Sequence, residues 1–151
     1  MNKKVFGRKL SRSRPAREAL FATLAKALII NGKIVTTRAK AKAVIGSVEK
    51  MVSLAKKGDI SGRRHVLGEL DNDRKVTDML FQKVAKAFPD RNSGFIRVIS
   101  LPRRVGDNAQ MVRMEWTEKI EYESKKVEAK KEEPKKVVKK VAKKTAKTAK
   151  K

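Results

Sequence analysis

Residues 3–28 read KKVFGRKLSRSRPAREALFATLAKAL, a basic arm that runs directly into an amphipathic helix. The first seventeen residues contain seven Lys or Arg and no Asp or Glu. Such an arm cannot bury itself, and beside a polyanion each cation would displace a condensed counterion. Pro15 suits a first helical turn, and an apolar stripe follows it. The stripe consists of Leu20, Leu24, Ala27 and Leu28. We predict an arm that is solvated on its own and anchored to a folded body; the alternative is a frayed basic terminus without a partner.

The positive charge is concentrated at the two ends of the chain. The 151 residues include 40 Lys and Arg against 16 Asp and Glu, a formal net charge of +24. Residues 1–58 contribute +13 and residues 124–151 contribute +10, whereas residues 59–123 contribute only +1. This imbalance is too large for an ordinary cytosolic enzyme, and a polyanionic partner would relieve the self-repulsion that it causes.

Several kinds of site are excluded by what the sequence lacks. There is no cysteine, so disulfides and thiolate metal sites are ruled out. The lone His65 makes a histidine metal cluster or a conventional catalytic triad implausible. No apolar run approaches the about 20 residues that span a bilayer, and the N-terminus lacks a signal peptide's apolar segment. We therefore expect a cytoplasmic protein that enters no membrane and uses no metal, cofactor or small-molecule substrate.

Apolar periodicity and helix breakers divide the chain into elements. We expect helices from Pro15 to a stop at Asn31-Gly32, from Thr36 or Thr37 to Gly58, from Asp59 or Ser61 through Leu70, and from the turn at residues 71–73 to Pro89. Strands are expected at residues 33–37, 95–101 and 110–117, with a long basic hairpin loop between the last two. The elements predict an α+β fold, three to four helices packed on a small, mainly antiparallel sheet.

The second predicted helix has the clearest periodicity. Its apolar face comprises Ala41, Val44, Ile45, Val48, Met51, Val52 and Ala55. Its basic flank comprises Arg38, Lys40, Lys42, Lys50, Lys56 and Lys57. The apolar face indicates core, and the flank is either a solvated surface or one that faces RNA.

The chain divides into three parts. Residues 1–14 form the basic N-terminal extension and residues 15–118 the α+β domain. Residues 119–151 form a tail rich in Lys, with few large apolar groups. Because such a tail cannot offset the entropy of folding, we expect it to be disordered.

No catalytic constellation emerges. Asp71 and Asp73 could bind Mg²⁺, but acids before a helix are more often caps. Asp107 lies between Gly106 and Asn108, a pattern that could form a phosphate-binding nest or supply a catalytic Asp. The alternative is a plain turn between two strands. His65 could contact nucleic acid or be exposed without a role. We therefore expect no enzyme.

The type of nucleic acid is left open by composition. Only seven residues are aromatic, and Phe95 and Trp116 alternate like core strand residues. A stacking platform for single strands is therefore poorly supported. Binding rich in lysine and poor in aromatics suits structured RNA or nonspecific contact with duplex DNA.

Three stretches of the chain form an ordered set of motifs. They are GRKLSRSRPAREALFATLAKALI at 7–29, IVTTRAKAKAV at 34–44, and GFIRVISLPRRVGDNAQMVRMEW at 94–116. Together they resemble the bacterial large-subunit ribosomal protein seventeen family. The similarity covers about residues 4–118, in unbroken order and spacing. The chain departs from the family at its first residues and at 14–17, where Arg-Pro-Ala-Arg replaces Ser-Ser-His-Arg.

The resemblance implies a structural protein of the 50S subunit. It would bind and clamp 23S rRNA near the exit of the polypeptide tunnel, beside neighbouring large-subunit proteins. Together with the charge pattern, it gives the candidate RNA-binding residues Lys3, Lys4, Arg8, Lys9, Arg12, Arg14, Arg17, Arg38, Lys40, Lys42, Arg63, Arg64, Arg103 and Arg104. The main alternative is a histone-like nucleoid DNA-binding protein, which explains the tail but not the ordered motifs. An RNA-modifying enzyme or nuclease is a third hypothesis, and it lacks catalytic groups.

Overall fold

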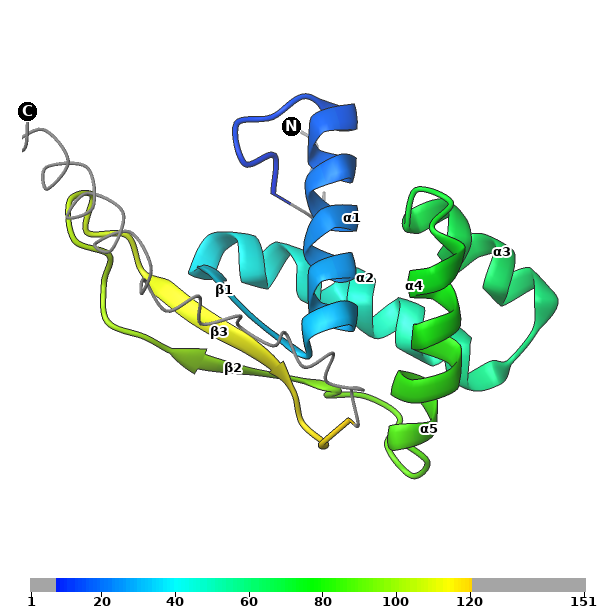
Figure 1. Ribbon diagram of the computed structural model, residues 1–151. Helices are drawn as coiled ribbons and strands as arrows, with labels where there is room; N and C mark the ends of the chain where they lie inside the picture. Colours follow the sequence, from blue (N-terminus) through cyan, green and yellow to red (C-terminus); the bar gives the residue numbers. More distant parts are fainter. Residues whose placement is uncertain (1–7, 121–151) are drawn as a thin grey trace, which may run out of the picture.

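The computed structural model describes residues 8–120, and the architecture is α+β as predicted (Figure 1). The elements are α1 (Arg14–Asn31), β1 (Lys33–Thr37), α2 (Arg38–Lys57), α3 (Ile60–Glu69), α4 (Arg74–Met79), η1 (Leu80–Val84), α5 (Ala85–Ala87), β2 (Ile96–Ser100) and β3 (Met111–Trp116). The candidates Lys3 and Lys4, and the predicted disorder of residues 121–151, lie outside the described residues.

The three strands form one antiparallel sheet in the order β1-β3-β2. The predicted hairpin of β2 and β3 is confirmed, and β1 pairs with the other side of β3, so that Ile34 and Val98 both stand opposite Met114. The inward residues of β3, Val112, Met114 and Trp116, are buried as their alternation predicted. The central strand β3 therefore pairs with one strand from the N-terminal third of the chain and with one from the second half of the chain.

The helices cover one face of the sheet. In Figure 1, α1 and α2 lie against the strands, α3 and α4 stand together at one end, and the β2–β3 loop projects at the other. The helix breakers act as predicted, because Gly32 and Gly58 follow α1 and α2 in the left-handed conformation, each with φ of 73°. Asp73 caps α4 by accepting a hydrogen bond from the Val76 N–H at 3.2 Å.

The face that α1 buries differs from the predicted stripe. Its buried residues are Ala22, Ala25, Leu28 and Ile29, whereas Leu20, Leu24 and Ala27 are only partly buried. The helix is apolar on several sides, so periodicity alone does not fix its rotation. Two alanines on the inner face leave room for α1 to lie close to α2, β1 and α4.

The last predicted helix is interrupted by a wider turn. The segment Leu80–Val84 is π-helical and lies between α4 and α5. The predicted residues Val76, Leu80, Val84 and Phe88 are all buried, and they recur every four residues. Residues spaced by four move gradually around a helix of 3.6 residues per turn and would leave the side that faces the core. A wider, π-helical turn corrects this rotation and keeps all four side chains on the core side.

Lys56, near the end of α2, holds the loop that leads into β2. Its Nζ donates to the Pro89 carbonyl at 3.2 Å and to the Arg91 carbonyl, and lies 5.8 Å from the centre of the Phe95 ring. Phe95 is fully buried and meets Phe88 edge to face, with 5.2 Å between ring centres. One lysine of the basic flank therefore has a structural role.

We predict that Lys56→Met lowers the free energy of unfolding by about 1–2 kcal/mol, because loop hydrogen bonds and a cation–π contact are lost. Lys57→Met is the matched control, since Lys57 is exposed and lies at the same end of the helix dipole. Urea unfolding measures both variants, and equal effects would show that Lys56 does not anchor the loop.

Candidate nucleic-acid interface

Three candidate cations from two parts of the chain line one hollow. Arg8 of the arm lies there with Arg38 and Lys42 from the start of α2. Thr37, Ala39, Ala109 and Gln110 complete the lining, and the volume is about 450 Å³. Arg38 connects its walls, because its backbone N–H and its guanidinium donate to the Gln110 carbonyl (2.9 Å) and to Oε1 of the same residue (3.2 Å). The fold therefore assembles a cationic hollow that we call the α2 hollow.

The start of α2 lacks the usual negative groups. Thr37 occupies the predicted N-cap position, but its side chain makes no capping hydrogen bond, and the first turn contains no acid. Arg38 and Lys40 lie in that turn instead. A helix N-terminus carries partial positive charge and unpaired N–H groups, so cations there are unfavourable unless an anion joins them. The α2 hollow has the charge and the donors for a phosphate.

The helix N-termini fall into two classes. The caps of α1 and α2 are Ser13 and Thr37, which carry no charge and make no side-chain cap hydrogen bond. The caps of α3 and α4 are the carboxylates Asp59 and Asp73. Positive charge without a nearby acid is therefore found where α2 begins, whereas at α1 Glu18 pairs with Arg14.

The exposed face of α2 continues the basic surface away from the hollow. Arg38, Lys42, Lys50 and Lys57 are all exposed, as the basic flank predicted. None of them forms an ion pair within residues 8–120, and the one acid of α2 is Glu49. Gly46 lies between Lys42 and Lys50, and a Cβ added to it would meet nothing within 4 Å. Glycine in an exposed helix costs about 1 kcal/mol relative to alanine. Nothing within the described residues requires it, whereas it would allow close approach of a backbone from outside.

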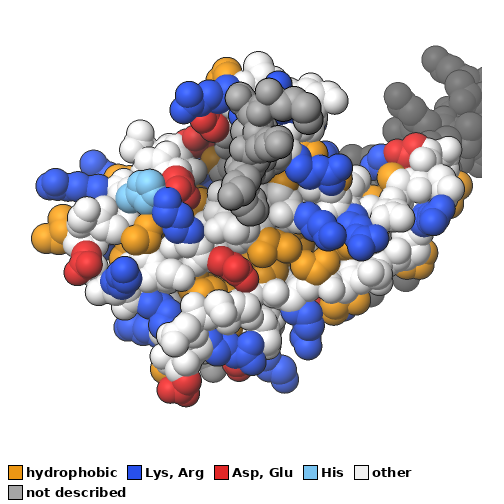
Figure 2. Space-filling model, turned by 180° about the vertical axis from the view of Figure 1, so that it is seen from behind, with side chains coloured by type: hydrophobic (Ala, Val, Ile, Leu, Met, Phe, Trp, Pro, Cys, Tyr) orange, Lys and Arg blue, Asp and Glu red, His pale blue; other side chains and the backbone are white. Residues whose placement is uncertain are grey.

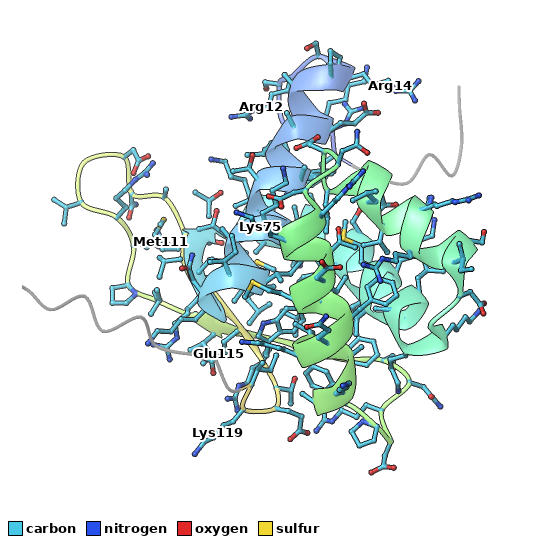
Figure 3. All side chains as sticks on the ribbon, turned by 45° about the vertical axis from the view of Figure 1, so that its right-hand side comes forward. Arg12, Arg14, Lys75, Met111, Glu115 and Lys119 are labelled. Atoms are coloured by element: carbon cyan, nitrogen blue, oxygen red, sulfur yellow. The ribbon has the colours of Figure 1, made fainter. Side chains whose placement is uncertain are left out.

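The described part of the arm, residues 8–13, contains a turn. Leu10 and Ser11 have φ of 53° and 54°, and the Arg12 N–H donates to the Lys9 carbonyl at 3.0 Å. The Arg12 guanidinium donates to the Leu10 carbonyl at 2.9 Å. Arg14 pairs with Glu18 at 2.9 Å on the first turns of α1. Figure 3 shows Arg12 and Arg14 projecting in different directions at this end of α1.

The hairpin loop is ordered by its own ion pair. The Arg104 guanidinium donates to Asp107 with Nε at 3.0 Å from Oδ1, and the Ala109 N–H donates to the same oxygen at 3.2 Å. These hydrogen bonds lower the pKa of Asp107 to about 2 and raise that of Arg104. Asp107 thus serves the turn, as the simpler interpretation of the sequence predicted. Arg103 has no such partner among residues 8–120 and is exposed.

The candidates on α3 are separate from the α2 hollow and are partly engaged. The Arg63 guanidinium pairs with Asp78 and lies 5.7 Å from the centre of the Phe81 ring. His65 Nε2 lies 3.2 Å from Glu69 Oε1, four residues further along the helix. Arg64 is one of the residues that line a different groove, between α1 and α3. The sequence placed these residues with the RNA-binding cations, but the fold does not bring them together with Arg8 and Arg38.

The remaining candidate residues have cationic side chains that form no ion pair or hydrogen bond within the described residues. Within residues 8–120, Lys9, Arg17, Lys40 and Lys42 have no ion pair or side-chain hydrogen bond. The same described part of the chain holds no group of three His, Cys, Asp or Glu side chains placed to bind a metal ion. None of its helices is both long and apolar enough to cross a membrane.

Sequence reasoning missed two contributors to this surface. Gln110 reaches the hollow from a position 72 residues after Arg38, through the pairing of β1 with β3. That contact depends on strand order, which periodicity does not reveal. Gly46 carried a readable signal, a glycine inside a strongly periodic helix.

We predict that the Asp107 carboxyl titrates with a midpoint near pH 2. Because its folded pKa lies below the unfolded value of about 3.9, the loop is stabilised above about pH 4 and loses this contribution as the pH falls through 2. Arg104→Gln should move the midpoint up, and Arg103→Gln should not. Carbon-13 NMR of the carboxyl measures this, and a wild-type midpoint near 4 would contradict the pairing.

Comparison with known proteins gives the family. The sequence profile described as Ribosomal protein L17 matches residues 20–117. A protein of a Sulfurihydrogenibium species, named Large ribosomal subunit protein bL17, is 42% identical over 119 residues, which are 78% of this chain and 98% of that protein. One of the same name from Persephonella marina is 44% identical over 119 residues, 78% of this chain and 96% of that protein.

The family resolves the hypotheses that composition left open. The three ordered motifs reflect common ancestry over most of the folded body, which the nucleoid hypothesis did not explain. Ribosomal structural proteins are not enzymes, in agreement with the expectation of no catalytic role. The chain belongs to the ribosomal protein L17 family and is a structural protein of the large subunit of the cytoplasmic ribosome.

Proposed function

We propose that this protein binds and clamps 23S rRNA near the exit of the polypeptide tunnel, with the α2 hollow as its central phosphate site. The observation that carries the proposal is the convergence of Arg8, Arg38 and Lys42 on an N-terminus without an acid. Cations and backbone N–H groups there act on the same anion. The tunnel location follows from the family resemblance, and neighbouring large-subunit proteins would complete the setting.

The hollow depends on the folded body, which makes it suited to clamping. Arg8 comes from the arm, Arg38 and Lys42 from α2, and Gln110 from the hairpin. An unfolded chain would separate these groups by tens of residues. The arm and the hairpin would each contact an rRNA segment and hold the two segments at a fixed spacing. The protein would thus support assembly of the subunit and would catalyse no reaction.

The other candidate cations extend the contact outward. Arg12 and Arg17 lie at the arm side, Lys40 beside the hollow, and Arg103 on the hairpin loop. Each would neutralise a phosphate brought near by rRNA folding and release a counterion. Phosphate contacts fix position without reading bases, so we expect shape recognition of folded rRNA.

We predict that the triple variant Arg8→Gln, Arg38→Gln, Lys42→Gln folds normally but binds large-subunit rRNA weakly. The slope of log K against log salt should fall by about one per lost phosphate contact, so by about three in total. Filter binding at several salt concentrations measures the slope, and circular dichroism checks the fold.

The matched control is Arg74→Gln, Lys75→Gln, Lys86→Gln. These residues are exposed, lie outside the candidate set, and remove the same net charge. For this control variant, the slope of log K against log salt should change much less than for the variant of the α2 hollow. Equal slopes in the two triple variants would show that only total charge matters, and would contradict a site at the α2 hollow.

We predict that Gly46→Ala has opposite effects on the free protein and on binding. It should raise the free energy of unfolding by up to about 1 kcal/mol, because alanine is the better helix former. It should weaken rRNA binding, because the new methyl group stands between Lys42 and Lys50. Gly68→Ala, in α3, is the control and should leave rRNA binding unchanged. Unchanged binding by Gly46→Ala would remove the α2 face from the interface.

A further inference from the structure

A groove between α1 and α3, over α2, differs from the rest of this basic surface. It has a volume of about 580 Å³ and lies apart from the α2 hollow. Its apolar lining comes from Phe21, Ala22 and Met51, of which the last two are buried. Gly68 leaves one wall open, since a Cβ there would meet nothing within 4 Å. We call it the α1–α3 groove.

The lining of this groove is richer in acids than the chain as a whole. Among residues 8–120, Glu18, Glu69 and Asp71 line it with one Lys or Arg, Arg64, although the whole chain carries +24. Arg14 pairs with Oε1 of Glu18 and Lys26 with Oδ2 of Asp71 from outside the lining. His65 also lines it. Figure 2 shows the histidine with acidic and basic side chains around it and apolar surface beside it.

Glu69 adds to the negative potential. One of its oxygens faces His65, and within residues 8–120 the other, Oε2, is buried without a hydrogen-bond partner. A buried acceptor without a donor is costly, and a cation nearby would lower that cost. Asp71 is exposed and pairs with Lys26 at 3.1 Å, so its second oxygen is open to another donor.

We propose that the α1–α3 groove binds a basic peptide segment of another large-subunit protein, with one large apolar side chain on Phe21 and Met51 and Lys or Arg at Glu18, Glu69 and Asp71. The inference rests on family membership and not on the rRNA site. Charge complementarity favours this occupant, because the ion pairs of Glu18 and Asp71 each use one carboxylate oxygen and leave the other to accept from an ammonium or guanidinium group. The phosphates of RNA offer no donor to these oxygens. The chain thus meets RNA with the N-terminal ends of α1 and α2 and meets protein between α1 and α3.

Photo-crosslinking inside purified 50S particles tests this assignment. A benzophenone amino acid replaces Gly68 in the groove, and in a second protein it replaces Gly46 on the basic face of α2. Both positions are helical glycines with open space at Cβ, so the two probes are matched. Mass spectrometry then identifies the crosslinked residues.

We expect the probe at Gly68 to react with a protein segment that contains Lys or Arg, no Asp or Glu, and an apolar residue at the crosslink. The probe at Gly46 should react with rRNA. The inference would be overturned if the Gly68 probe reacted with rRNA or with an acidic segment. It would also be overturned if the Gly68 probe reacted with no partner chain while the Gly46 probe did react. Loss of the Gly46 reaction with RNA would count against the rRNA site alone. If the Gly68 protein does not enter 50S particles, a probe at Ser47, which also lines the groove, replaces it.

Charge variants give a second readout. Glu69→Gln with Asp71→Asn should lower the yield of the protein crosslink several-fold, and asparagine tolerates the positive φ of 48° at position 71. Asp59→Asn with Asp90→Asn raises the net charge equally at exposed sites outside the groove and should leave the yield unchanged. Equal yields in both variants would overturn the role of the carboxylates.

Discussion

Positive charge without a local counterpart at the start of α2 is the constraint from which the organisation of this protein follows. Arg38 and Lys40 lie where a helix favours acids, and the Thr37 cap supplies no negative group. The free protein tolerates this because the core elsewhere is closed around β3, with Met114 and Trp116 buried under the helices. A phosphate in the α2 hollow would turn an unfavourable arrangement into a favourable one.

The acids are distributed unevenly along the chain and over its surface. Residues 59–78 carry five acids and four cations, whereas residues 8–58 carry only Glu18 and Glu49 against thirteen cations. Acids occupy the N-cap positions of α3 and α4, pair with Arg63, and line the α1–α3 groove. Under the two proposals, the acid-poor side would contact a polyanion and the side with more acids would contact protein, although the net charge is strongly positive.

Sequence reasoning reached the fold class, the order of the elements and most helix ends, because glycine, proline and alternation act locally. Val112, Met114 and Trp116 were identified as the inward face from alternation alone. The predicted stripe of α1 was right only in part: Leu28 is buried and Leu24 packs against the core, but the small residues Ala22 and Ala25 are the ones that face the core there. The π-helical turn at Leu80–Val84 and the strand order depend on packing between distant segments. The α2 hollow was missed for the same reason: its cations were named singly, and only the fold shows that Arg8 joins Arg38 and Lys42 while Arg63 does not.

The most direct measurement is the structure of the large ribosomal subunit that contains this protein, at a resolution that shows rRNA phosphates and side chains. We predict a backbone phosphate of 23S rRNA in the α2 hollow, within hydrogen-bond distance of Arg38 and of at least one of Arg8 and Lys42. A hollow that faces solvent, or that is filled by a protein side chain, would contradict the claim that the start of α2 is the central rRNA contact.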